Sequence, residues 1–483
     1  MFLGLDLGTS GLRGLLIDAE GRALDSAEAS YSVAHPHPGW SEQDPADWIS
    51  ACRDVIAALS AKHVGGLRDL QGIGLSGHMH GATLLDENGA VLRPCMLWND
   101  TRSHAQAQVM DAQPAFRSVT GNIVFPGFTA PKVQWVAENE PDIFSQIARI
   151  LLPKDYLAHW LAGAHTSDMS DSAGTAWMDT GARAWSTELL DASGLNETQM
   201  PTLCEGSDVA GVLRADLAAE LGLPAGIPVA AGGGDNAAAA CGIGALNEGD
   251  GFVSLGTSGV LLAARDGFSP DAGTAVHTFC HAIPDTWYQM GVILAATDSL
   301  NWLASVLDSD AAGLTAQLGE RIGTPSNVQF LPYLSGERTP HNDSAIRGAF
   351  VGLDIATTRA DLTRAVLEGV SFALRDSLEA LRATGADLQS VIAIGGGAQS
   401  RYWVELVATV LNLPVDLPEQ GEFGAAMGAA RLALCAATGA NPRDVMTKPA
   451  IAETIVPNPD LRAAYNDAYA NYRALYPALK GLT

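Results

Sequence analysis

Two carboxylates and two hydroxyl-rich turns are the groups in this chain best suited to chemistry. Asp6 ends an apolar, strand-like run, and Asp235 follows three consecutive glycines. The pentapeptide LGTSG occurs at residues 7–11, directly after Asp6, and again at residues 255–259. Turns of this composition present backbone N–H groups and hydroxyls to phosphate, and a carboxylate can hold Mg²⁺ or accept a proton. Together they predict a site for phosphoryl transfer.

Each pentapeptide lies between two apolar runs, so each is expected to form the tip of a β-hairpin. Strand and tip recur in the same order. This repetition predicts two related domains, each bringing one phosphate-binding hairpin to a shared cleft. Arg13 is a further candidate for a phosphate contact, although an arginine beside a hairpin is as often a surface residue. The expected phosphate contacts at the tips are Thr9, Ser10, Gly256, Thr257 and Ser258.

Asp6 is assigned to a Mg²⁺ site beside the phosphates. The alternative is a carboxylate that only caps its own turn. The second hairpin carries Ser254 at the matching position and therefore keeps a single acid for the pair. This asymmetry favours the metal.

Asp235 stands between a glycine run and an alanine-rich helical segment. The glycines would allow a substrate to approach the backbone closely. The helix N-terminus would keep the carboxylate ionised. These features suit a base that accepts a proton from a hydroxyl as its oxygen attacks phosphorus, while an ordinary N-cap aspartate is the alternative.

A second glycine run, residues 395–397, lies between a strand-like and a helical segment. Gly396 and Gly397 are the expected contacts for an adenosine that lies against the backbone. Tight strand–helix turns also use glycine, so this signal is weaker than the hairpins.

Several other patterns are set aside. Residues 72–77 fit G-x-G-x-x-G, but the glycines fall within a strand, which argues against dinucleotide binding. His277 and His281 have no clear further metal ligand, so core packing is the expectation. His80 follows a strand end, where ligand-facing residues belong in α/β folds, and it is a candidate for a sugar hydroxyl contact. A buried histidine with its hydrogen bonds satisfied is the alternative.

The composition limits the fold and the partners. With 483 residues the chain should form more than one core, and alternating strand and helix signals predict an α/β fold with domains at 1–247 and 248–483. A net charge of -26 disfavours nucleic acid and anionic membranes as partners. Six scattered cysteines without a CxxC pair, and the lack of a signal peptide or an apolar membrane span, predict a cytoplasmic protein.

The hairpins and acids together resemble the actin- and hexokinase-type ATPase superfamily. More narrowly, the chain resembles the FGGY family of carbohydrate kinases. Residues 127–135 match the first family signature, and residues 348–353 with 361–368 match the second. Further segments resemble the bacterial branch of the family that acts on D-xylulose; they are residues 40–45, 79–86, 97–100, 152–156, 167–171, 232–236 and 334–341.

The resemblance implies an ATP- and Mg²⁺-dependent kinase with two ribonuclease-H-like domains around a central cleft. It implies that Asp235 is the catalytic base and that Met79, His80 and Asn236 line the pentulose site. It further places Asp6, Thr9 and Thr257 in the Mg-ATP site and Gly396 and Gly397 in the adenosine site. A homodimer is suggested by the resemblance alone.

Two alternatives stay open. His78 stands where these kinases more often have glutamine, so another sugar or polyol, such as ribulose or a deoxyketose, is the second hypothesis. The third is an actin-like ATPase that does not act on a metabolite.

Overall fold

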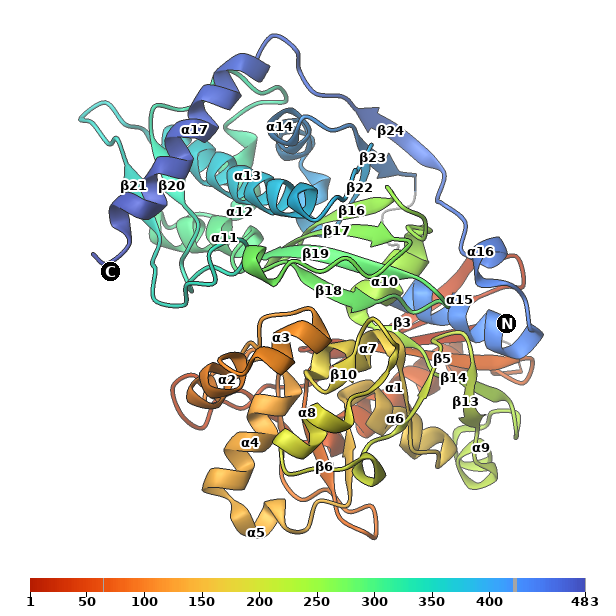
Figure 1. Ribbon diagram of the computed structural model, residues 1–483. Helices are drawn as coiled ribbons and strands as arrows, with labels where there is room; N and C mark the ends of the chain where they lie inside the picture. The colour runs from red at the N-terminus through yellow and green to blue at the C-terminus, as the bar shows by residue number, and fades with distance from the viewer. Residues whose placement is uncertain (64, 420–423, 483) are drawn as a thin grey trace.

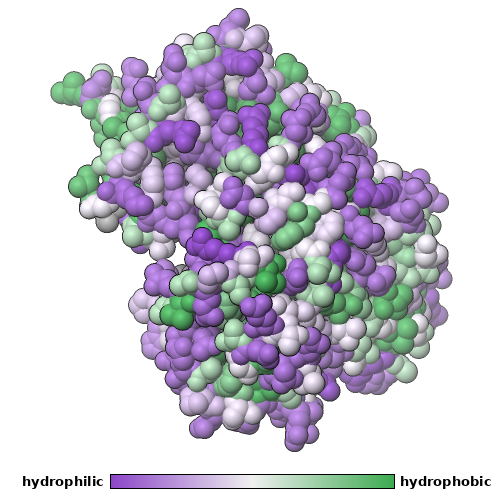
Figure 2. Space-filling model, viewed as in Figure 1, coloured by the Kyte–Doolittle hydropathy of each residue, from purple (hydrophilic) through white to green (hydrophobic). Residues whose placement is uncertain are grey.

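The computed structural model describes residues 1–63, 65–419 and 424–482. Two lobes are visible, each built on its own β-sheet (Figure 1). Polar and apolar side chains are interspersed over the face shown in Figure 2, and the outline is notched between the lobes. Among the described residues, no helix has the length and apolar character required to cross a membrane.

The first sheet contains seven strands from the N-terminal half. Its main order is β13-β14-β5-β1-β2-β3, and β15 pairs with β5. The first three strands form an antiparallel meander, while β5 runs parallel to β1 and β14 parallel to β5. The strands span β1 Phe2–Leu7, β2 Gly11–Ile17, β3 Ala23–Ser30, β5 Gly72–Gly77, β13 Val209–Val212, β14 Pro228–Ala230 and β15 Gly233–Gly234.

The second sheet contains seven strands from the C-terminal half, in the order β18-β19-β17-β16-β22-β23-β24. Strands β16, β17 and β19 form an antiparallel meander, and β22 and β23 run parallel to β16. The strands span β16 Gly251–Leu255, β17 Gly259–Arg265, β18 His277–Cys280, β19 Trp287–Ile293, β22 Val391–Ile394, β23 Val415–Pro418 and β24 Ile451–Ile455.

The two sheets share one topology. An antiparallel three-stranded meander is followed by two strands parallel to its first strand, in β3-β2-β1-β5-β14 and in β19-β17-β16-β22-β23. This is the ribonuclease-H-like arrangement expected from the repeated pentapeptide. The predicted fold of two related α/β lobes is confirmed.

Helices cover the sheets through apolar faces at helical spacing. In α1, Pro45–Lys62, Asp44 caps the first turn by accepting from Ala46 N at 2.9 Å, and Trp48 and Val55 are buried. The long helix α13 begins at Arg359, where Thr358 and Asp361 form a capping box. The other helices used below are α4 Thr129–Asn139, α6 Pro153–Ala162, α7 Met169–Ser172, α10 Asp235–Ile243, α11 Thr297–Val306, α13 Arg359–Ala383, α14 Arg401–Leu411, α15 Ala425–Thr438 and α17 Arg462–Leu479.

Helix α15 belongs to the second half of the chain but packs against β1 and β5 of the first sheet and against α10 (Figure 1). The contact is close enough to require glycine. A Cβ atom on Gly4 or Gly74 would lie about 2.0 or 1.9 Å from a backbone oxygen of α15, and one on Gly428 about 1.8 Å from Ala238 O. The glycines of residues 72–77 lie within β5, as predicted. The lack of a side chain at Gly74 allows α15 to pack directly on this strand.

A continuous apolar cluster joins the two lobes. Phe128 of the first half lies 6.0 Å from Phe279 of the second, measured between ring centroids. Tyr288 of β19 donates a hydrogen bond to Met79 Sδ at 3.7 Å. The lobes therefore share buried side chains as well as α15.

Candidate active site

The first hairpin tip connects β1 and β2, whose pairing ends at Leu7 and Leu12. Three side chains from other segments hold it. Tyr31 Oη donates to Gly8 O at 2.5 Å, Gln43 Nε2 donates to Thr9 O at 2.6 Å, and Trp98 Nε1 donates to Thr9 Oγ1 at 3.0 Å. The tip is thus fixed by side-chain donors.

The second tip connects β16 and β17, whose pairing ends at Leu255 and Gly259. The start of α11 holds this tip. Ala296 N donates to Thr257 O at 2.8 Å, and Thr297 donates to Gly256 O through both its backbone N–H at 2.9 Å and its hydroxyl at 2.8 Å. Thr257 itself is exposed, as a phosphate contact must be.

Asp6 lies near the end of β1, where Arg13 of β2 and Ser76 of β5 are its neighbours in register. Burial raises the pKa of the Asp6 carboxyl, and Ser76 and Arg13 oppose that rise. A half-buried carboxylate at a strand end, beside a second acid, suits a hard divalent cation.

Asp235 is the first residue of α10, and Gly234 is the N-cap. Its Oδ1 accepts from Asn236 N at 2.7 Å and from Asn236 Nδ2 at 2.8 Å. Burial, with the charge of Asp6, raises the pKa of Asp235 to about 6, although the Asn236 bonds oppose this. The sequence predicted an ionised carboxylate at the helix N-terminus. Burial raises its pKa, but at about 6 Asp235 remains mainly ionised at neutral pH.

A buried polar network fixes the backbone just before Asp235. Gly234 N donates to Ser170 Oγ at 3.0 Å, and Ser170 Oγ donates to Asp168. Asp168 is in turn paired with Lys154 at 2.7 Å, and all three side chains are fully buried. The network ties α6 and α7 to the strand end that carries Asp235.

Met79 and His80 follow β5, which lies beside β15 in the sheet. A Cβ atom on Gly234 would lie 2.9 Å from Met79 Cγ, so Met79 is directly beside the residue that precedes Asp235. His80 is buried and stacks on Phe128 at 4.8 Å. His78 lies elsewhere: its ring meets the edge of Trp48 at 5.8 Å, and burial lowers its pKa to about 3.

A cavity of about 800 Å³ is lined from both lobes. Arg13, Asp235 and Asn236 line it from the first lobe, and Ser254 and Gly396 from the second. A second cavity of about 760 Å³ shares Gly396 and adds Gly397, Asn301 and residues of α12, Ala311–Ala316, and of α14. The two cavities therefore adjoin at the glycine run.

Of the predicted site residues, Arg13, Asp235, Asn236, Gly396 and Gly397 line these two cavities. Ser10 and Arg13 line a smaller cavity of about 320 Å³ together with residues of β2 and β3. The sequence interpretation missed Gln43, Trp98 and Tyr288, because their contacts with the hairpin or with Met79 join distant segments. It also missed the α11–α12 wall of the second cavity.

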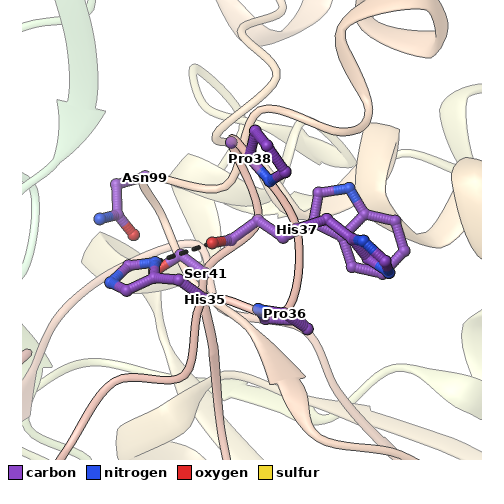
Figure 3. Close-up of a pocket in the computed structure, with 8 residues that line it drawn as sticks. His35, Pro36, His37, Pro38, Ser41 and Asn99 are labelled. Carbon is purple, nitrogen blue, oxygen red and sulfur yellow. Dashed lines mark hydrogen bonds between the residues drawn. The ribbon is translucent and has the colours of Figure 1, made fainter.

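The loop at residues 35–41 precedes Gln43 and forms a surface pocket of about 470 Å³ with Asn99. Figure 3 shows His35 and His37 on this loop, with the bond between His35 Nδ1 and Trp40 O at 2.8 Å drawn as a dashed line. His37 lies against the Trp40 ring at 4.5 Å. The loop thus leads into β4, Glu42–Gln43, and Gln43 is one of the three residues that donate hydrogen bonds to the first tip.

The histidines at 277 and 281 were expected to pack in the core. His277 is buried and stacks on Phe279 at 5.3 Å, and His281 Nε2 bonds to Ala245 O at 3.3 Å. Within the described ranges, neither belongs to a cluster with metal-ligand geometry, and the core expectation is confirmed.

Two ribonuclease-H-like lobes that each present a glycine- and hydroxyl-rich hairpin define an actin- and hexokinase-type ATPase architecture. Residues 1–242 match the N-terminal domain of the FGGY family of carbohydrate kinases, and residues 251–437 match its C-terminal domain. The chain belongs to the FGGY family of carbohydrate kinases.

Individual relatives are similar over the whole chain. The xylulose kinase of Escherichia coli (strain K12) is 43% identical, with 99% of each chain covered. A crystal structure described as a xyloylose kinase from Brucella ovis is 58% identical, with a TM-score of 0.97 and 100% of each chain covered. The gluconate kinase from Lactobacillus acidophilus is 25% identical, with a TM-score of 0.90, 99% of this chain and 98% of that chain covered.

Proposed function

We propose that this carbohydrate kinase transfers the γ-phosphoryl group of ATP to O5 of D-xylulose, giving D-xylulose 5-phosphate and ADP. The sugar is inferred from the similarity to the E. coli and B. ovis enzymes. The phosphoryl transfer rests on one observation in particular. The base candidate Asp235 and the glycine run at Gly396 line the same cavity from opposite lobes.

In this proposal the adenosine lies against Gly396 and Gly397, in the second cavity between α12 and α14. The phosphates extend into the first cavity towards both hairpin tips. Backbone N–H groups and hydroxyls would bind them there. Arg13 would add a local positive charge, which matters because the protein as a whole carries a net charge of -26 and repels phosphate. The assigned residues are Thr9, Ser10, Arg13, Gly256, Thr257 and Ser258.

The sugar is proposed to lie beside Met79, His80 and Asn236, next to Asp235. Asp235 accepts the O5 proton as O5 forms a bond to the γ-phosphorus and the bond to ADP breaks. A pKa of about 6 leaves the carboxylate ionised at neutral pH while making it more basic than an ordinary aspartate. The hydrogen bonds from Asn236 and the Gly234–Ser170 bond hold it in one orientation.

Asp6 fits the Mg²⁺ that such a kinase uses. Its carboxylate is half-buried and close enough to raise the pKa of Asp235, and it lies next to the first hairpin tip. When bound, Mg²⁺ would neutralise the charge of the phosphates. Asp6 would hold it, directly or through water.

We further propose that the halves 1–247 and 248–483 act as the sugar-binding and nucleotide-binding domains. Helix α15 is then the part of the second domain that anchors it to the first sheet. All six cysteines are free, which supports the proposal of a cytoplasmic enzyme.

The test is ADP release with Mg-ATP across D-xylulose, D-ribulose, L-ribulose, L-fuculose, gluconate and glycerol. A preference for D-xylulose in kcat/KM supports the proposal. A preference for another sugar keeps the chemistry but moves the specificity. ATP hydrolysis that is indifferent to every sugar would favour the actin-like alternative.

A further inference from the structure

His80 has an unusual backbone. Its φ is 72°, in the left-handed region that residues other than glycine rarely adopt. Two donors from α4 hold its carbonyl: Lys132 Nζ at 2.9 Å and Thr129 Oγ1 at 3.1 Å. A strained backbone persists only where its surroundings over-determine it, and such positions cluster at ligand sites.

Lys132 is itself unusual. Its side chain is fully buried, and its ammonium donates to two carbonyls, His80 O and Gly127 O at 2.6 Å. No carboxylate in the described part of the chain lies within ion-pair distance of it. Burial lowers the pKa of Lys132 to about 7. Burying an ammonium without an acid is costly, so a purely structural role is a poor explanation.

The His80 ring is fixed as well. Nδ1 lies 2.7 Å from Gly174 O, and because a carbonyl can only accept, Nδ1 must carry the proton. A Cβ atom on Gly174 would lie 2.5 Å from that ring, so only glycine allows the contact. Burial and the charge of Lys132 hold the pKa of His80 well below its usual range. The ring is neutral, and Nε2 is left as a hydrogen-bond acceptor with no partner among the described residues.

We propose that Lys132 is a positioning residue for sugar recognition. With Thr129 it holds His80 in the left-handed backbone conformation, and with Gly174 it fixes the neutral tautomer whose Nε2 accepts a hydrogen bond from a sugar hydroxyl. This inference rests on the proposed sugar site and adds what that site requires: a hydroxyl donor, as in an uncharged ketose, at the position of Nε2. A negatively charged group at this position would face the acceptor lone pair of Nε2 and would be disfavoured.

The experiment is a double-mutant cycle in the full chain, with steady-state kinetics varied in D-xylulose and in ATP. The variants are Lys132→Met, His80→Ala and the double variant. Thr129→Val is a matched change at the same carbonyl that removes a donor without removing a charge. We expect Lys132→Met to raise the sugar KM by about 10-fold or more, and Thr129→Val by about 5-fold, with the KM for ATP unchanged. In the His80→Ala background, Lys132→Met should add less than about 2-fold, because coupled residues are not additive.

Additive effects of Lys132→Met and His80→Ala would overturn the proposal, since a structural lysine would act independently of the ring. So would an equal rise in both KM values. Should Lys132→Met not fold, an unchanged sugar KM in Thr129→Val would overturn it instead. A sugar KM unchanged in His80→Ala would show that the proposed sugar site is wrong, which is a different outcome from failure of the positioning role.

Discussion

The same five residues, LGTSG, form both hairpin tips, yet the two tips are supported in different ways. The tip at Thr9 is held by the side chains of Tyr31, Gln43 and Trp98. The tip at Thr257 is held mainly by backbone N–H groups at the start of α11. Local sequence therefore specifies the hairpin, and its neighbours decide how the hairpin can be perturbed.

The two hairpins also differ in charge. Asp6 and Ser254 occupy the same position before the pentapeptide, and their strand partners are Arg13 in the first hairpin and Val260 in the second. A tip with an acid can organise a cation, whereas a neutral tip can only donate hydrogen bonds to phosphate. We therefore expect the two hairpins to differ in function, with a cation at the first and only phosphate contacts at the second, and four experiments test this.

The largest expected effect comes from the base that both tips are proposed to serve. Asp235→Ala should lower turnover by about 10²–10⁴-fold, because a positioned base contributes that much. ATP binding, measured by calorimetry, should stay near that of the wild type because both tips remain. A turnover within a few-fold of wild type would remove Asp235 from the reaction and break the idea of a shared centre.

The charge difference is tested by Asp6→Asn against Ser254→Ala. The first should raise the Mg²⁺ concentration for half-maximal activity by about 10–100-fold, the cost typical of losing a residue that orients a metal. The second should leave the Mg²⁺ titration unchanged. Equal Mg²⁺ titrations for the two variants would mean that the hairpins are alike in this respect.

The pH profile makes the same distinction. Asp235 must be deprotonated to act as a base, and its pKa is raised to about 6, so kcat/KM should fall about tenfold per pH unit below that value. Asp6 raises that pKa, so Asp6→Asn should move the acid limb to lower pH. Ser254→Ala is the control, and an acid limb that stays in place in Asp6→Asn would contradict the assignment.

The smallest effect concerns the supports. Trp98→Phe removes the donor to Thr9 Oγ1 and should raise the KM for ATP about fivefold, as the loss of one hydrogen bond of about 1 kcal/mol implies. Thr297→Val removes only the hydroxyl donor to Gly256 O, and the backbone N–H remains, so a change below about twofold is expected. The reverse order would show that the second tip is the fragile one.

Much of the fold could be predicted because its signals are local. The pairing of β1 with β2 follows from two apolar runs around a glycine-rich tip, and the start of α1 follows from Asp44 and Pro45. The glycine run at residues 395–397 was predicted to lie between a strand and a helix, and in the structure it follows β22 and precedes α14. The glycines at 72 and 74 were correctly assigned to a strand, but their reason, the close approach of α15, lies more than 350 residues away.

The candidate site also has features that local sequence predicts and features that depend on distant contacts. The residue types of Asp6, Asp235 and the hairpin tips, and their positions after strands, were sufficient for a hypothesis of phosphoryl transfer. The raised pKa of Asp235, the support of Thr9 by Trp98 and the lock of Lys132 on His80 were not foreseen. Each depends on burial or on a contact between segments distant in the sequence.

The sequence by itself thus determined the repeated hairpins, the two-lobed α/β class and the acids available for chemistry, because turn propensity and hydrophobic periodicity act over a few residues. Only the tertiary structure decided which carboxyl has a raised pKa, which tip is held by side chains and which histidine is fixed through its backbone carbonyl and its ring. Those properties follow from desolvation and hydrogen-bond partners, which exist only after distant segments have packed together.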